Sequence, residues 1–140
     1  MLFATFLTPL FSHYIMFKKY LEVTMMQKHN IPEEVINAFH MMWDTYPIHA
    51  RLIHKDRTVL AVNKAGEKMG MTVGVRCFEQ SPSRDHSRCL ANQALEENTA
   101  KYRVAAVAPR MAFWIPVAGV PDVYVHSYLP LPTEEDKATS

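Results

Sequence analysis

Cys77, His86 and Cys89 are the residues of this chain whose types and spacing could do chemistry together. Thiolate and imidazole groups suit zinc or iron, and the His-x2-Cys spacing would place two of them on one helical turn. No fourth ligand is local, however, and structural zinc sites usually use paired Cys-x2-Cys units. The two thiols could instead form a reversible disulfide or pack in the reduced state. The three residues are therefore a candidate metal or redox site, with packed reduced thiols as the favoured alternative.

Other cofactor and catalytic patterns are weaker. The sequence has no Cys-x-x-Cys-His, which excludes covalent attachment of a c-type haem. A non-covalent haem would need an axial histidine, for which His40, His86 and His126 are the candidates. There is no Gly-rich phosphate loop and no Gly-x-Ser-x-Gly nucleophile elbow. The adjacent pairs of acidic residues are explained better as solvated surface charge than as general acids or bases. We therefore expect a protein that is not an enzyme, and the sequence leaves any cofactor unidentified.

A second group of candidate residues is aromatic, with a few polar side chains among them. Such a group either lines an apolar ligand pocket with polar anchors or forms a packed core and a dimer surface, and the second interpretation is favoured. The candidate pocket residues are Phe39, Trp43, Arg51, Asn63, Phe113, Ile115 and His126.

The length and composition of the chain are those of one globular domain. The chain has 140 residues, 49% of them hydrophobic, which is enough for a core. With 15 basic and 14 acidic residues the net charge is +1, and the basic residues are scattered. Nucleic-acid binding requires a clustered basic excess, so we expect no nucleic-acid partner. Two cysteines are too few for a disulfide scaffold.

The first 17 residues are strongly apolar and end at Lys18-Lys19. They are too short for a transmembrane helix and lack the features of a secretory signal. A membrane-surface or partner helix is a further interpretation, which Pro9 disfavours because proline breaks helices. The interpretation given most weight is that translation starts downstream, at Met16, Met25 or Met26, so that this segment is an extension.

Hydrophobic periodicity predicts the elements that position the candidate residues. A helix is expected over 31–46, with Asn30 and Glu33 as a capping box. Strands at 48–54 and 58–62 flank a polar turn, and Asn63 caps a short helix over 64–69. After a loop, Asp85 or Ser87 would cap a helix over 88–97 that Asn98 closes. Three strands then follow at 100–107, 111–117 and 123–129, before a polar tail.

This order of elements resembles a PAS domain over about 31–129. The residues that carry the resemblance are Trp43–Pro47, Leu60–Ala65, Gly74–Phe78 and Phe113–Val117. The resemblance implies an α+β fold, with a five-stranded antiparallel sheet in the order 2-1-5-4-3 and helices on one face. It also implies a cavity between sheet and helices, which holds a ligand or cofactor in some members. Light-sensing members carry their reactive cysteine after an Asn, which Arg76-Cys77-Phe78 lacks.

We therefore expect an apolar extension over 1–29, a PAS-like domain over 30–130 and a polar tail over 131–140. The expected function is sensing or interaction in signal transduction, with a small ligand or a partner protein. A homodimer is expected through the N-terminal helix over 31–46, by its Met42–Trp43 face. The expected location is the cytoplasm, and membrane association through residues 1–17 is not favoured. The rival hypothesis is a metal- or haem-binding redox sensor that uses Cys77, His86 and Cys89 or a cavity histidine. A small enzyme is the least favoured alternative.

Overall fold

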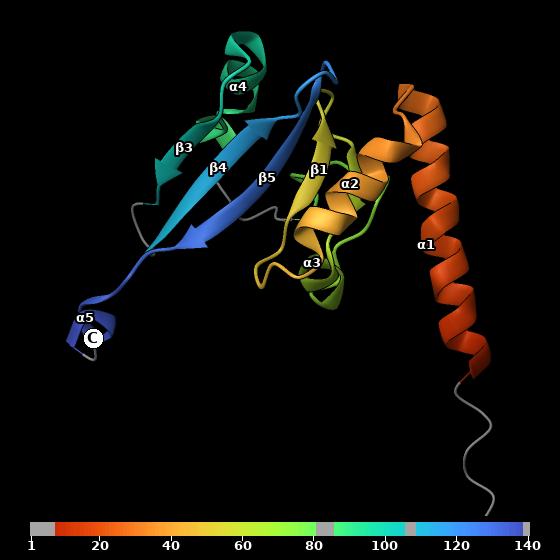
Figure 1. The fold of residues 1–140 in the computed structure, drawn as a ribbon, viewed down its shortest axis with the longest axis horizontal. Helices are drawn as coiled ribbons and strands as arrows, with labels where there is room; N and C mark the ends of the chain where they lie inside the picture. Colours follow the sequence, from red (N-terminus) through yellow and green to blue (C-terminus); the bar gives the residue numbers. More distant parts are fainter. Residues whose placement is uncertain (1–7, 81–85, 106–108, 139–140) are drawn as a thin grey trace, which may run out of the picture.

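The structure, a computed structural model, describes residues 8–80, 86–105 and 109–138. A five-stranded antiparallel sheet forms the centre of the domain, with strand order β2-β1-β5-β4-β3 (Figure 1). Its strands are β1 (Arg51–His54), β2 (Val59–Val62), β3 (Lys101–Val104), β4 (Arg110–Pro116) and β5 (Val123–Pro130). This order confirms the predicted fold class, because β5 returns to the middle of the sheet and pairs with both β1 and β4.

The hairpin between β1 and β2 turns tightly on polar residues. Arg57 adopts a left-handed φ of 77°, which lets the chain reverse within five residues. The Asp56 carboxylate accepts a hydrogen bond of 2.9 Å from the backbone N–H of Thr58. Burial would raise the pKa of Asp56, but hydrogen bonds from Thr58, His29 and His54 hold that pKa well below its usual value. The turn therefore presents a carboxylate that stays ionised.

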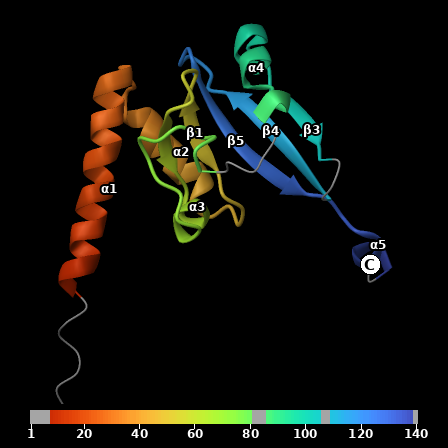
Figure 2. The ribbon, with the colours of Figure 1, turned by 180° about the vertical axis from the view of Figure 1, so that it is seen from behind.

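The two faces of the sheet carry separate apolar clusters. On one face α2 (Glu33–Trp43) packs Ile36 and Phe39 against Leu52 and Val125 of the sheet. On the other face α4 (Ala91–Glu97) packs Ala91 and Ala94 beside Trp114 and Tyr124, and Figure 2 shows this helix next to β3 and β4. The sheet therefore has helices on both faces, whereas the resemblance implied helices on one face only; the difference arises because α2 covers the face opposite α4. Trp114 and Tyr124 lie on the α4 face.

The N-terminal segment forms a long helix, α1 (Thr8–His29). The prediction that Pro9 would break a helix was wrong, because Pro9 lies in the first turn, where no intrahelical hydrogen bond is lost. No helix among the described residues is both long enough and apolar enough to cross a membrane. Large apolar side chains of α1 are nevertheless exposed, namely Phe11, Tyr14, Ile15, Met16, Phe17, Tyr20 and Val23.

Two predicted helix caps are not formed. Asn30 has a left-handed φ of 53° and follows the end of α1, while α2 begins after Pro32 with no side-chain cap. Likewise α4 begins after Leu90 with no side-chain cap, so Ser87 does not cap it, and Asp85 lies outside the described residues. Asn98 closes α4 in the left-handed conformation, as predicted. The polar tail contains one short helix, α5 (Glu134–Ala138).

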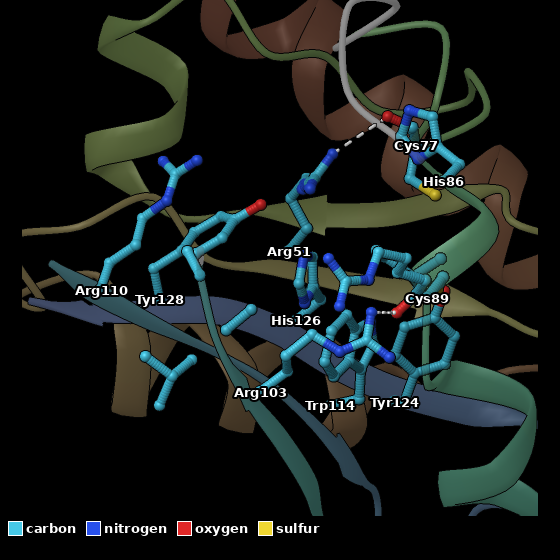
Figure 3. A pocket seen from close by; sticks show the side chains of 15 residues that line it. Arg51, Cys77, His86, Cys89, Arg103, Arg110, Trp114, Tyr124, His126 and Tyr128 are labelled. Atoms are coloured by element: carbon cyan, nitrogen blue, oxygen red, sulfur yellow. Dashed lines mark hydrogen bonds between the residues drawn. The ribbon is translucent and has the colours of Figure 1, made fainter. Parts of the chain in front are cut away.

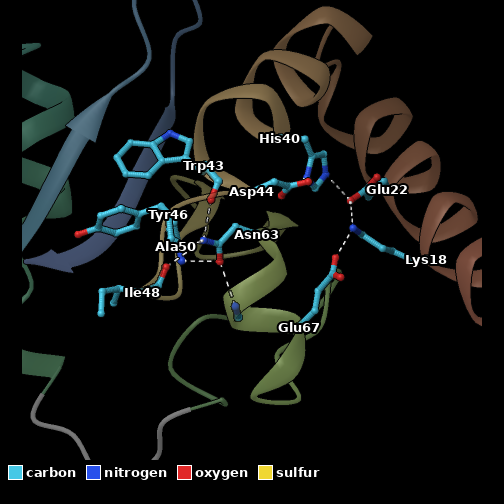
Figure 4. A network of polar contacts seen from close by, with 11 residues as sticks. Lys18, Glu22, His40, Trp43, Asp44, Tyr46, Ile48, Ala50, Asn63 and Glu67 are labelled. Carbon is cyan, nitrogen blue, oxygen red and sulfur yellow. Dashed lines mark hydrogen bonds and ion pairs between the residues drawn. The ribbon is translucent and has the colours of Figure 1, made fainter.

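Ion pairs attach α1 to the rest of the domain (Figure 4). His40 of α2 lies between two carboxylates, with Nε2 2.9 Å from Glu22 of α1 and Nδ1 3.0 Å from Asp44. Lys18 of α1 contacts Glu22 and also pairs with Glu67 of α3 (Lys64–Lys68). Both ring nitrogens of His40 can donate only when the ring is an imidazolium. The contact between α1 and α2 is therefore strongest when His40 is charged.

We expect the stabilisation from His40 to disappear as the pH rises. Burial would lower the pKa of His40, but hydrogen bonds to Glu22 and Asp44 raise it above its ordinary value. A raised pKa in the folded state gives stability that is complete below the unfolded value of about 6.5 and is lost as the pH rises through the folded value. Urea unfolding at about pH 5.5 and about pH 9 should therefore show that His40→Gln costs roughly 1 to 2 kcal/mol only at the lower pH.

The matched control for this prediction is His86→Gln, because His86 is exposed and lies away from α1. An equal cost of His40→Gln at both pH values would show that His40 stabilises α1 by packing rather than by charge.

Candidate functional site

A cavity of about 250 Å³ lies over the α4 face of the sheet (Figure 3). Its floor is formed by alternate residues of β1, β4 and β5, and its walls come from β3 and from the segments that carry Cys77 and His86. The described residues that line it include four arginines, two histidines and three large aromatic side chains, and none of them is acidic. These charged and aromatic residues are Arg51, Arg88, Arg103, Arg110, His86, His126, Trp114, Tyr124 and Tyr128.

Three arginines come from three different strands. Arg51 of β1 is 4% exposed and donates from a guanidinium nitrogen to the Cys77 carbonyl at 3.2 Å. Arg103 of β3 donates to the carbonyl of Arg88. Arg110 of β4 stacks over the Tyr128 ring at 4.7 Å, and its buried Nε has no hydrogen-bond partner among the described residues. The carbonyls and the ring that contact these guanidinium groups carry no negative charge themselves. The cavity is therefore suited to an anion.

Aromatic residues of β4 and β5 form the flat side of the cavity. The register places Trp114 opposite His126, and their rings stack 4.8 Å apart at 14°. Nδ1 of His126 lies 2.8 Å from the Phe113 carbonyl, which can only accept, so Nδ1 carries a proton. Burial raises the pKa of Tyr124, whose hydroxyl accepts a hydrogen bond of 3.1 Å from Arg57. Tyr124 therefore contributes a neutral phenol to the cavity wall.

Both cysteines line this cavity and neither forms a disulfide. Burial raises the pKa of the Cys77 thiol, and the nearby charge of Arg51 lowers it by a smaller amount. Cys77 is therefore held as a thiol, which is the less reactive form. Within the described part of the chain, Cys77, His86 and Cys89 do not bring three ligand atoms together as a metal site requires.

The structure separates the seven candidate pocket residues into three groups. Arg51 and His126 line the cavity. Phe39 and Trp43 belong to α2 and pack in the core on the opposite face. Phe113 and Ile115 are not among the described residues that line the cavity; the β4 residue between them, Trp114, lines it instead. Asn63 is fully buried and caps α3, so its role is structural.

The sequence analysis missed Arg103 and Arg110 as cavity residues. It counted Trp114, Tyr124 and Tyr128 in the aromatic group but did not select them for the candidate pocket. The signal that could have selected Tyr124 and Tyr128 is the alternation along β5, in which these two residues share one face with the predicted His126. Since Trp114 pairs with His126, it points to the same face, and Phe113 and Ile115 point away.

Comparison with known proteins supports the fold. No family model matches this chain, and neither does any curated protein sequence. Among solved structures, the photoactive yellow protein domain of the sensor histidine kinase Ppr from Rhodospirillum centenum is similar, with a TM-score of 0.50 and 16% sequence identity. The match covers 68% of this chain and 96% of that domain. This likeness and the strand order together establish a PAS-like fold.

Proposed function

We propose that this chain is a sensory domain that binds a small anionic ligand in the arginine-lined cavity. The observation that carries the proposal is the set of guanidinium groups around the cavity, with no carboxylate among its described lining residues. Buried cations are expensive unless an anion or several hydrogen bonds accompany them. A bound carboxylate or phosphate would supply that anion, and the Trp114–His126 stack would contact a planar body attached to it.

The size of the cavity narrows the class of ligand. Its volume of about 250 Å³ lies just below the range of about 300 to 1,000 Å³ that is common for drug-sized ligands. A small organic acid or a small phosphate ester fits this space, whereas haem is much larger. The similar photoactive yellow protein domain belongs to a sensor histidine kinase, which agrees with a sensory role for this fold.

The test is native mass spectrometry of the full chain, purified without added ligand, with an absorbance spectrum of the same sample. We expect an extra mass that corresponds to a small acid, or stabilisation of the empty protein by one member of a panel of carboxylates and phosphates. Arg51→Met should weaken that binding by about 10- to 100-fold, the scale of one charged hydrogen bond. Arg76→Met is the control, because Arg76 is exposed and does not line the cavity.

Equal binding by wild type and Arg51→Met, or no stabilisation by any anion, would contradict the proposal. A domain that works only through protein contacts would give the second result.

The same experiment tests a redox alternative, which is favoured by one observation: both free cysteines line the same cavity. If the domain senses oxidants, a mild oxidant should lower the mass of the wild type by two hydrogens as the disulfide forms. Cys77→Ser with Cys89→Ser would abolish that change.

The mass of the intact assembly also tests the expected homodimer. The sequence places that interface on the helix over 31–46. We propose instead that α1 forms it, because the large apolar side chains of α1 are exposed and an apolar surface of this kind is usually covered by a partner. A signalling partner protein could occupy the same surface, and the native mass distinguishes the two by showing a dimer or a monomer.

A further inference from the structure

Two histidines and an aspartate meet where α1 touches the β1–β2 hairpin. His29 is the last residue of α1, His54 is the last residue of β1, and Asp56 lies in the turn that follows. One ligand atom from each of the three residues lies within 4.8 Å of the others. The side chain of His29 is 5% exposed, that of His54 16% and that of Asp56 43%, so the group is sheltered on one side and open on the other.

The ring of His29 is oriented with Nε2 toward Asp56. Its Nδ1 lies 3.0 Å from the backbone carbonyl of Met25, which can only accept a hydrogen bond. Nδ1 therefore carries the proton, and in a neutral ring Nε2 does not. That Nε2 lies 3.0 Å from Oδ2 of Asp56, so it donates to the carboxylate when the ring is an imidazolium and turns a lone pair toward it when the ring is neutral. A contact between a histidine N–H and a backbone carbonyl is the arrangement that commonly orients a metal-binding imidazole.

The other two residues are held in a similar way. Oδ1 of Asp56 accepts from the backbone N–H of Thr58 at 2.9 Å, which fixes the carboxylate and leaves Oδ2 directed at His29. Nδ1 of His54 lies 3.0 Å from Oδ1 of Asp56 and receives a long contact of 3.3 Å from the backbone N–H of Asp56. The His29 and His54 rings lie with their centroids 4.5 Å apart. Ligand atoms of two imidazoles and one carboxylate thus converge, and a divalent cation between them would replace the imidazole protons that otherwise bridge to the carboxylate.

We propose that His29, His54 and Asp56 bind one divalent transition-metal ion of the zinc class. Imidazole nitrogens and a carboxylate oxygen are ligands that zinc accepts at about 2.0 to 2.2 Å. The described chain supplies three ligands, so a water molecule or a small anion completes a tetrahedral site on the exposed side. Calcium and magnesium prefer sites made of oxygen atoms, and two imidazoles disfavour them.

The ion would join α1 to the β1–β2 hairpin, two parts of the domain that are far apart in the sequence. His29 and Asp56, for example, are 27 positions apart. One ligand comes from α1 and two come from the hairpin, so binding requires α1 to be docked. Metal binding and docking of α1 are therefore coupled, and each stabilises the other. The site is separate from the arginine-lined cavity, whose described lining includes none of the three ligands.

The test uses the full chain, treated with a chelator and dialysed, and titrated with Zn²⁺ by calorimetry and with Co²⁺ by visible absorption. We expect one ion per chain and the absorption bands of tetrahedral Co²⁺. Asp56→Asn and His54→Gln should each weaken Zn²⁺ binding by more than about 100-fold, because each removes a direct ligand. Two controls should leave it unchanged, namely His86→Gln and the double change of Cys77 and Cys89 to Ser.

Circular dichroism of each variant shows whether it is folded before its titration is interpreted. If His54→Gln does not fold, Asp56→Asn still decides the question, because it is isosteric and exposed. Absence of Zn²⁺ binding by the folded wild type would overturn the proposal, and the three residues would then be an ion pair between protonated histidines and a carboxylate. Binding that survives Asp56→Asn but is lost in the cysteine double variant would overturn it too, since the ion would then belong to the thiols.

Discussion

Replacement of Asn63 by alanine is expected to lower the free energy of unfolding by about 3 to 5 kcal/mol, which is exceptional for one substitution. The side chain is fully buried and uses all its hydrogen-bonding capacity. Its oxygen accepts from the backbone N–H groups of Ala50 at 2.8 Å and Gly66 at 3.0 Å. Its nitrogen donates to the carbonyls of Trp43 and Ile48, both at 2.9 Å.

Alanine would remove the partner of the Ala50 and Gly66 N–H groups and of the Ile48 carbonyl, whereas the Trp43 carbonyl still accepts from the Tyr46 N–H at 3.1 Å. Each unsatisfied buried group costs about 1 to 3 kcal/mol before the structure relaxes. Because small domains have a total stability of about 5 to 15 kcal/mol, Asn63→Ala is expected to be close to unfolding at room temperature. Urea denaturation measures the difference in the free energy of unfolding between the wild type and this variant. Asn37→Ala is the control, since Asn37 is an exposed asparagine of α2, and it should cost less than about 0.5 kcal/mol. A loss below about 1 kcal/mol for Asn63→Ala would falsify this account of the residue.

Replacement of Trp114 by alanine is the second change with a large expected effect. Trp114 is 6% exposed, stacks on His126 and packs in the same cluster as Ala91 and Ala94 of α4. A buried tryptophan changed to alanine typically costs about 3 to 5 kcal/mol, because the apolar contacts are lost and a void remains. The void would open into the arginine-lined cavity, so Trp114→Ala should also enlarge the space available to a ligand.

Ile115→Ala is the matched control, because Ile115 is the next residue of β4, is 36% exposed and points to the other face. Chemical denaturation of both variants should show a cost at Trp114 that is at least twice that at Ile115. Comparable costs would mean that the face assignment of β4 is incorrect.

Much of the fold could be predicted from the sequence because local signals and the overall order of elements agree. Asn63 before a short helix, the polar turn at Asp56 and the alternation in β5 each indicate one local structure, and together they indicate one topology. The predicted strand order is confirmed by the structure. The predicted helix bounds were less accurate, since α2 covers only 33–43 of the expected 31–46.

The candidate site was predicted in part, and the reason is geometric. Arg51, His126 and both cysteines line one cavity, although the sequence analysis placed them in two unrelated sites. The side of β4 that faces this cavity depends on its pairing with β5, which no local pattern in β4 reveals. In the same way, His29 and Asp56 lie 27 positions apart, and only the packing of α1 brings them together.

The length of α1 gives its attachment a mechanical consequence. A helix of 22 residues is roughly 33 Å long, and its hydrogen-bonded contacts with the domain lie at Lys18, Glu22 and His29. The contacts from Lys18 to His29 therefore hold the second half of the helix, and the part before Lys18 extends beyond them like an arm. A tilt of about 10° at Lys18 would carry the Thr8 end, roughly 15 Å away, through roughly 3 Å. Any event that loosens or tightens those contacts is thus amplified along α1, away from the sheet.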